Sequence, residues 1–338
     1  MSTPAQDTPA QDSLETGKPF DDIRALVTNM PAVDEKARYA VEEALAGFVP
    51  ALSPFGGLGR ALMWLGGWQG RPLPSIDRPL VAVFAGSHLV AEDVIGADPI
   101  IGCRERVGGM TEGAAAARGI AQSHGAAFKV YEMGIDYPAA KITKEPSLSE
   151  RDCAAAIAFG MEVVAEGADT IVLGNAGFGS ATAAAAICYG LYGGTPEYWA
   201  GGTGPVAKAR IEAVRKAADV HKDGLSDPLN VLALFGGRDI AGMVGAIIAA
   251  RHQAIPVILD GYVVCAAAAV IHKIRPDAIS HCYAGHVTSE PAHAALLDRM
   301  GLKPMVDLGI GIGDSTGATL AMGLLKAAAS GLKTVSQS

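Results

Sequence analysis

The sequence predicts a doubly wound α/β fold, in which helices cover both faces of a parallel sheet. Short apolar runs alternate along the chain with longer helical stretches, which is the pattern of repeated βαβ units. The runs are apolar at consecutive positions, as is typical of strands buried on both faces. Glycines cluster where the runs end, and there they allow the backbone to approach a ligand closely.

Length and composition limit the class of protein. The chain has 338 residues, which suits one large domain or two modest ones. Charged residues make up 18% of it, against about 25% in a typical globular chain, so a sizeable core is expected. The net charge of −8 argues against a broad nucleic-acid surface. No apolar run approaches the roughly 18 residues of a membrane span.

The N-terminus and the cysteines indicate a cytoplasmic protein. Residues 1–18 are polar, repeat PAQD and show no apolar period, so we expect a disordered tail and no secretory signal. The cysteines are odd in number and form no CxxC pair, which indicates reduced thiols. They are Cys103, Cys153, Cys188, Cys265 and Cys282.

The first structured elements are helical patterns at about 20–30, 34–48 and 57–69. No strand separates them. We therefore expect residues 19–75 and the last helix, within 311–338, to form a small helical domain from both chain ends. Residues 76–310 would form the large α/β domain.

Within the large domain, strands and helices alternate in sequence. The predicted strands are Pro79–Ala85, Ala127–Glu132, Thr170–Leu173, Asn230–Leu234, Pro256–Leu259, Ala278–Tyr283 and, more weakly, Pro304–Leu308. The predicted helices cover about 108–124, 149–166, 180–192, 205–220, 238–252, 262–273, 289–300 and, at the end, 315–330.

The turn Gly174–Thr182 joins an apolar strand to an alanine-rich helix. Glycines followed by hydroxyl residues at a helix start can bind a phosphate group through backbone N–H groups. The turn matches neither a Walker A loop nor GxGxxG. A tight turn in which Ser180 caps the helix explains the pattern equally well, and both interpretations stay open here.

Two further glycine-rich turns precede helices. Gly201–Pro205 leads into a helix with Lys208 and Arg210, where amides and a cation suit an anion, although a flexible loop with solvated cations is the simpler interpretation. Leu308–Gly317 carries one carboxylate, Asp314, which is either a helix cap or a general base.

Other catalytic classes have weaker support. The candidate metal ligands are His88, His281, His286 and His293. They show no HxH or HExxH spacing, so structural or hydrogen-bonding roles are favoured over zinc. The residues therefore predict no metal site. No G-x-S-x-G elbow supports a serine nucleophile.

Together these blocks resemble the nicotinate-nucleotide–dimethylbenzimidazole phosphoribosyltransferase family, over about residues 19–330. The segments that carry the resemblance are KPFDDIRAL, VAVFAGSH, IVLGNAGFGSATAAAAI, GGTG, GGRDIAGMVGAIIAARHQAIPVILDGYV, AGHVTSEPAH and LGIGIGDSTGATLAMGLL.

The resemblance implies a Rossmann-like parallel sheet of about six strands and a homodimer. It implies a pentosyltransferase that moves the 5-phosphoribosyl group of nicotinate mononucleotide to a benzimidazole nitrogen. Nicotinate leaves, the anomeric centre inverts and an α-ribotide for the cobamide lower ligand forms. The resemblance also implies that no metal or redox cofactor is required.

The resemblance also assigns site residues. The phosphate and ribose would bind at Gly177, Phe178, Gly179, Ser180, Ala181, Thr182, Gly202, Thr203 and Gly204, with Lys208 or Arg210 as the cation. The acceptor pocket is expected at Ser87, His88, Leu89, Glu105 and Ile312.

The sequence departs from the family at both catalytic carboxylates. The family glutamate in a GEGSG or GEGTG turn is Asp314 here, one methylene shorter, and a general base must come within about 2.6–3.2 Å of its proton or act through one water. The second carboxylate is Asn175 here, which carries no charge. Glu105 could compensate from another loop.

The predicted acceptor pocket is altered as well. The family segment Q-M-V-x-N-F is replaced by charged residues and glycine at 104–109. Two hypotheses follow. One is an active transferase with an altered aromatic acceptor and Asp314 as base. The other is a catalytically impaired paralogue that binds a nucleotide or base, or that supports an active paralogue in a heterodimer.

Overall fold

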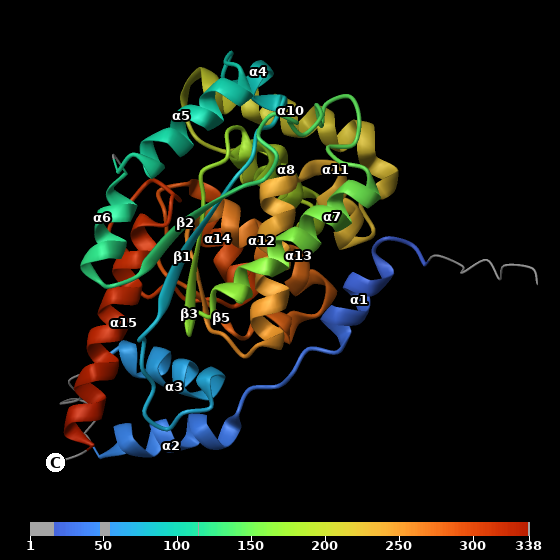
Figure 1. Ribbon diagram of the computed structural model, residues 1–338. Coiled ribbons are helices and arrows are strands. Elements are labelled where there is room, and N and C mark those ends of the chain that lie inside the picture. Colours follow the sequence, from blue (N-terminus) through green and yellow to red (C-terminus); the bar gives the residue numbers. More distant parts are fainter. Residues whose placement is uncertain (1–16, 48–54, 114, 337–338) are drawn as a thin grey trace, which may run out of the picture.

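The computed structural model describes residues 17–47, 55–113 and 115–336, so nearly all of the predicted tail lies outside the described residues. A parallel sheet of five strands in the order β2-β1-β3-β4-β5 forms its centre (Figure 1). This is the flavodoxin-like order of doubly wound sheets, which confirms the predicted fold class with fewer strands than expected. The strands are β1 (Pro79–Ala85), β2 (Ala127–Glu132), β3 (Thr170–Asn175), β4 (Val257–Leu259) and β5 (Cys282–Ala284).

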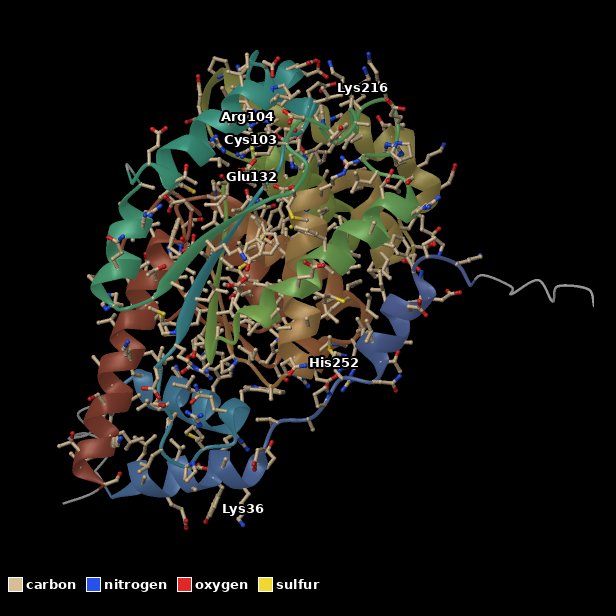
Figure 2. All side chains as sticks on the ribbon, in the orientation of Figure 1. Lys36, Cys103, Arg104, Glu132, Lys216 and His252 are labelled. Atoms are coloured by element: carbon tan, nitrogen blue, oxygen red, sulfur yellow. The ribbon has the colours of Figure 1, made fainter. Side chains whose placement is uncertain are left out.

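Both faces of the sheet are apolar because side chains alternate between two separate cores. Leu80 and Phe84 of β1 belong to one core and Val81 and Val83 to the other. Every residue of β1 is buried, which explains its continuous apolar run. Side chains fill the space between the sheet and the helices on either face (Figure 2).

One face is covered by helices from the middle of the chain and by α1, which all contribute to the first core. They are α1 (Asp21–Thr28), α7 (Glu150–Met161), α8 (Ser180–Tyr192), α11 (Pro228–Phe235), α12 (Arg238–His252), α13 (Gly261–Ile274) and α14 (Pro291–Met300). Arg24 of α1 pairs with Asp227 just before α11. Helix α1 therefore lies on the large α/β part, away from α2 and α3 (Figure 1).

The other face is covered by helices from both ends of the chain and by α5 and α6. They are α2 (Glu35–Ala46), α3 (Leu58–Gln69), α5 (Pro99–Thr111), α6 (Ala116–Ser123) and α15 (Thr316–Val335). Helix α15 contacts α6 and α3 and runs along the side of the molecule toward α2 (Figure 1).

Shorter elements and one long helix complete the described chain. They are α4 (Val90–Val94), α9 (Pro196–Ala200), α10 (Gly204–His221), η2 (Glu162–Glu166), η3 (Lys222–Gly224) and η4 (Pro276–Ile279). No helix in the described ranges is both long and apolar enough to cross a membrane. The five cysteines are buried and form no disulfide.

Two predicted strands are wrong. Residues 230–234 lie in the helix α11, which Asp227 starts by accepting hydrogen bonds from the N–H groups of Leu229 and Asn230. The helix is buried nearly all round, and a short buried helix has the same apolar run as a buried strand. Residues 304–308 make only one bridge, between Val306 and His286.

Candidate functional site

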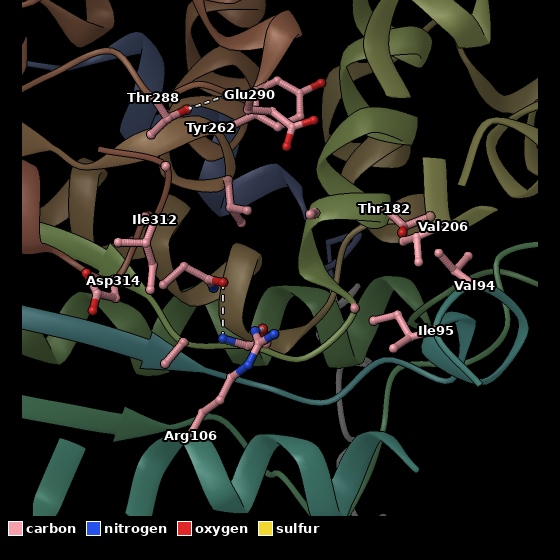
Figure 3. Close-up of a pocket in the computed structure, with 18 of the residues that line it drawn as sticks. Val94, Ile95, Arg106, Thr182, Val206, Tyr262, Thr288, Glu290, Ile312 and Asp314 are labelled. Atoms are coloured by element: carbon pink, nitrogen blue, oxygen red, sulfur yellow. Dashed lines mark hydrogen bonds between the residues drawn. The ribbon is translucent and has the colours of Figure 1, made fainter. Parts of the chain in front are cut away.

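A cavity of about 520 Å³ opens where the strands end, and its lining comes from several distant segments (Figure 3). It is bounded by the ends of α4 and α5, the turn between β3 and α8, the start of α10, the start of α13 and the segment before α15. Its volume suits a small molecule. Its position at the carboxyl ends of parallel strands is where ligands bind in this architecture.

The turn between β3 and α8 forms one wall of the cavity. Gly177, Gly179, Ala181 and Thr182 all line it. Gly179 has φ +94°, a conformation that glycine adopts without strain. At the start of α8 the Thr182 N–H donates to the Gly179 carbonyl at 3.0 Å, whereas the N–H groups of Ser180 and Ala181 make no hydrogen bond to the described residues. Thr182 is only 2% exposed and its hydroxyl makes no hydrogen bond to the described residues, so this wall can bind an anion.

Asn175 also lines the cavity, and hydrogen bonds fix its amide. Its Nδ2 donates to Asp239 Oδ2 at 2.8 Å and to the Phe84 carbonyl at 3.3 Å, and its Oδ1 accepts from the Gly177 N–H at 3.1 Å. The amide thus uses both its donor and its acceptor. A carboxylate here would offer no donor to Asp239 and would place two negative charges side by side.

Asp239, near the start of α12, is a buried carboxylate behind this wall. It is 0% exposed, and besides Asn175 it contacts His88 Nε2 at 2.9 Å and the Ser180 hydroxyl at 2.7 Å. Burial alone raises the pKa of Asp239, but His88, Ser180 and Asn175 outweigh burial and hold that pKa at about 2. A Cβ on Gly177 would come within 2.2 Å of Asp239 Oδ2, so glycine is required there.

Asp314 lies at the opposite end of the cavity (Figure 3), is 8% exposed and lines the cavity. Its Oδ1 accepts a hydrogen bond from the Thr316 N–H at 3.0 Å, while Oδ2 accepts none from the described residues. The N-cap residue of α15 is Ser315 and not Asp314, so the cap interpretation of Asp314 is wrong, and Asp314 Oδ2 is available to a ligand in the cavity. The turn packs directly on β3, where a Cβ on Gly174 would lie 2.7 Å from the Ser315 Cβ.

A second buried carboxylate, Asp260, holds the Asp314 turn. Its two oxygens accept hydrogen bonds from the N–H groups of Ser315 at 2.8 Å and Ala318 at 2.7 Å. His286 Nε2 lies 3.0 Å from Asp260 Oδ1. Ser315 has φ +83°, which is uncommon for a residue other than glycine, and these bonds keep it there.

The predicted acceptor residues divide into two groups. Glu105 and Ile312 line the cavity. Ser87, His88 and Leu89 do not: the Ser87 hydroxyl donates to the Ile135 carbonyl at 2.6 Å, and the Leu89 N–H donates to the Ala139 carbonyl at 2.9 Å. The His88 ring contacts Asp239 instead, with Nε2 2.9 Å from Oδ1.

The predicted phosphate residues also divide. Arg210 lines the cavity, whereas Gly202, Thr203, Gly204 and Lys208 are exposed and lie outside its lining. Of the β3–α8 turn, Phe178 and Ser180 are missing from the lining. The Ser180 hydroxyl donates to Asp239 and does not cap the helix.

Sequence reasoning missed several residues of the site. Residues that line the cavity or hold its walls and that were not predicted include Asp239, Asp260, Tyr262 and Glu290. Arg106 lies in the segment 104–109 that was expected at the acceptor pocket, and it lines the cavity. A signal for the two aspartates was present, since each stands at the start of an apolar helix, in GGRD and in ILDG.

Comparisons with known proteins agree with this architecture. The model of a family described as "Phosphoribosyltransferase" matches residues 30–338. The chain is 47% identical to the nicotinate-nucleotide–dimethylbenzimidazole phosphoribosyltransferase of Sinorhizobium medicae (strain WSM419) and 46% identical to that of Rhizobium meliloti (strain 1021). Each match covers 95% of this chain and 97% of the relative.

A solved structure of the enzyme of that name from Thermus thermophilus superposes with a TM-score of 0.81 at 30% identity. The match covers 89% of this chain and 96% of that one. The sequence matches and this superposition name the same enzyme, and they extend over nearly the whole chain. The chain therefore belongs to the nicotinate-nucleotide–dimethylbenzimidazole phosphoribosyltransferase family.

Proposed function

We propose that this protein transfers the 5-phosphoribosyl group of nicotinate mononucleotide to a nitrogen of a benzimidazole-type base and releases nicotinate. The observation that carries the proposal is that Asp314 and the N-terminus of α8 line one cavity. An anion-binding helix end and a carboxylate on opposite walls suit a phosphorylated donor and an acceptor that must lose a proton.

The proposed reaction assigns a role to each wall. The phosphate binds at the N–H groups of α8 and at Thr182. The acceptor nitrogen attacks the anomeric carbon from the face opposite nicotinate, the C–N bond to nicotinate breaks, and nicotinate leaves with the electron pair. Asp314 accepts the N–H proton of the acceptor. Inversion at the anomeric carbon gives the α-ribotide.

The decisive experiment is an assay with nicotinate mononucleotide and dimethylbenzimidazole that measures nicotinate and ribotide by mass. We expect Asp314→Asn to lower kcat about 10²–10⁴-fold, the usual contribution of a general base, and to leave mononucleotide binding in place. Asp307→Asn is the matched control, because Asp307 is an exposed acid of the same loop outside the cavity lining. Full turnover by Asp314→Asn would reject Asp314 as the base.

The impaired-paralogue alternative is favoured by the neutral Asn175, whose amide is committed to Asp239 and Gly177. It predicts mononucleotide binding without ribotide formation. Asp314→Glu separates two causes of weak activity, a carboxylate that is too short and an altered acceptor pocket. If the Asp314 carboxylate is only too far from the acceptor proton, the longer side chain raises the turnover of dimethylbenzimidazole. If the acceptor pocket has changed, it does not.

We also propose a homodimer that works in the cytoplasm, with α2, α3 and α15 as its small helical domain. Contacts of α3 with α2 and α15 support the domain. Light scattering of the purified protein tests the dimer, and mixing with a paralogue tests the heterodimer.

A further inference from the structure

The cavity has a cation other than the two that the sequence suggested. Lys208 is exposed and does not line the cavity. Arg210 lines it, but hydrogen bonds to Glu290, Ala200 and Gly201 already use four of its five N–H donors, including Nη1 to Glu290 Oε2 at 3.4 Å. Nη2 donates to Glu290 Oε1 at 2.7 Å and to the Gly201 carbonyl at 2.8 Å, and Nε donates to the Ala200 carbonyl at 3.2 Å.

Arg106, by contrast, has free donors. It rises from α5 into the cavity (Figure 3), where Nη1 donates to the Gly177 carbonyl at 2.5 Å. Its guanidinium carbon lies 4.8 Å from the centre of the Phe178 ring. No carboxylate of the described residues pairs with it. Since a guanidinium has five N–H donors, most of them remain available to a ligand.

The surroundings of Arg106 favour an anionic ligand. The carbonyl and the ring that hold it belong to the turn before α8, and the first N–H groups of a helix lack partners within it. Thr182 in the same wall is 2% exposed, and its hydroxyl has no partner in the described part of the chain. Glu105 lines the cavity too, but it makes no ion pair with Arg106 among the described residues. Its negative charge would repel an anion, so the anion is expected to contact Arg106 and not Glu105.

We propose that Arg106 is the residue that binds an anionic group of a substrate in this cavity, either the phosphate of the mononucleotide or a carboxylate of the aromatic partner. The inference rests on the proposed function for the identity of the substrates. Arg106 would then determine specificity, because its planar guanidinium can donate two parallel hydrogen bonds to the two oxygens of a carboxylate or phosphate.

The experiment is calorimetry of four ligands on the full chain and on variants. The ligands are nicotinate mononucleotide, the nucleoside without its phosphate, benzimidazole and benzimidazole-5-carboxylate. Arg106→Met should weaken anion binding about 10- to 100-fold, the usual effect of losing charge-assisted hydrogen bonds. Arg104→Met is the matched control, since it removes the same charge from α5 at an exposed residue that pairs with Asp136.

The ligands identify the source of the anion. A loss for the mononucleotide but not for the nucleoside assigns Arg106 to the phosphate. A loss confined to benzimidazole-5-carboxylate assigns it to the acceptor. Equal binding of every anionic ligand by Arg106→Met and wild type would overturn the inference.

Two readouts keep the inference separate from folding and from the proposed function. Arg106→Lys keeps the positive charge but lacks the planar guanidinium, and it should bind the anion more tightly than Arg106→Met. If Arg106→Met instead damages the Gly177 turn, its affinity for all four ligands should fall together, and that result would count against the inference. If the wild type forms no ribotide but its anion binding depends on Arg106, the proposed function is rejected and this inference stands. If the wild type forms ribotide and its anion binding does not depend on Arg106, this inference is rejected and the proposed function stands.

Discussion

Two buried aspartates hold the two walls of the cavity, and they do so in different ways. Asp239 contacts side chains from three places: His88 after β1, Asn175 at the end of β3 and Ser180 at the start of α8. Asp260 accepts hydrogen bonds from backbone N–H groups of the turn that carries Asp314. The first wall therefore depends on the identity of its side chains, and the second depends mainly on backbone position.

The difference explains which substitutions each wall accepts. Asn175 fits the first wall because its amide donates to Asp239 while its oxygen accepts from Gly177. Ser315 is accepted in the second wall despite φ +83°, because Asp260 binds its N–H and not its side chain. Four experiments test this difference between the two walls.

The largest effect is expected for Asp239→Asn. The substitution removes a buried charge on which three side chains converge, and breaking a buried pair from one side typically costs about 3–5 kcal/mol of unfolding free energy. Urea unfolding at neutral pH measures it. Because Asp239 holds the β3–α8 turn, mononucleotide binding should weaken as well. A variant as stable as wild type would show that Asp239 does not organise this wall.

Asp260→Asn should cost less, about 2 kcal/mol, because the new amide oxygen keeps one of the two backbone hydrogen bonds and loses the other charge-assisted one. The functional effect should be on the wall that carries Asp314. The value of kcat should drop because the Asp314 turn shifts, while the affinity for the mononucleotide changes little. If Asp260→Asn weakens mononucleotide binding more than Asp239→Asn does, the two walls are not separate.

Lowering the pH should destabilise the wall that Asp239 holds, because Asp239 becomes protonated. Its pKa is about 2 in the folded chain, against an ordinary value of 3.8. A carboxyl whose pKa is lowered by folding stabilises the native state above its unfolded pKa, and that stabilisation is lost as pH falls from about 4 to 2. A shift of this size corresponds to about 2 kcal/mol. Comparing the pH dependence of unfolding of wild type and Asp239→Asn isolates this contribution; parallel curves would contradict it.

The smallest effect, and the only gain, is expected for Ser315→Gly. A residue with a side chain in the left-handed region costs about 1–2 kcal/mol, and the buried Ser315 hydroxyl has no hydrogen-bond partner among the residues that the structure describes. Glycine removes both costs but adds entropy to the unfolded chain, so we expect about 1 kcal/mol of extra stability. Ser315→Ala is the control, because it removes the hydroxyl and keeps the strained φ. Equal stability of the two variants would assign the gain to the hydroxyl.

Much of the fold follows from the sequence because it depends on neighbours in the chain. Consecutive apolar residues predict buried strands such as Pro79–Ala85, which the structure confirms to the residue. Periodicity fails where burial is complete, as in α11, since a short helix with no solvent face has no polar stripe to identify it. Residues 108–124 similarly looked like one helix and are parts of α5 and α6.

The α/β class, the glycine-rich turns and the place of Asp314 in one of them can be predicted from the chain, because they are properties of contiguous residues. The tertiary structure selects the side chains that meet at the cavity. His88 and Asp239 are 151 positions apart, and Asp260 and Ser315 are 55 apart. It also left Lys208 outside the cavity lining, paired Arg210 with Glu290 and kept donors of Arg106 free. The physical reason is that a hydrogen bond depends on distance in space, which distance along the chain does not fix.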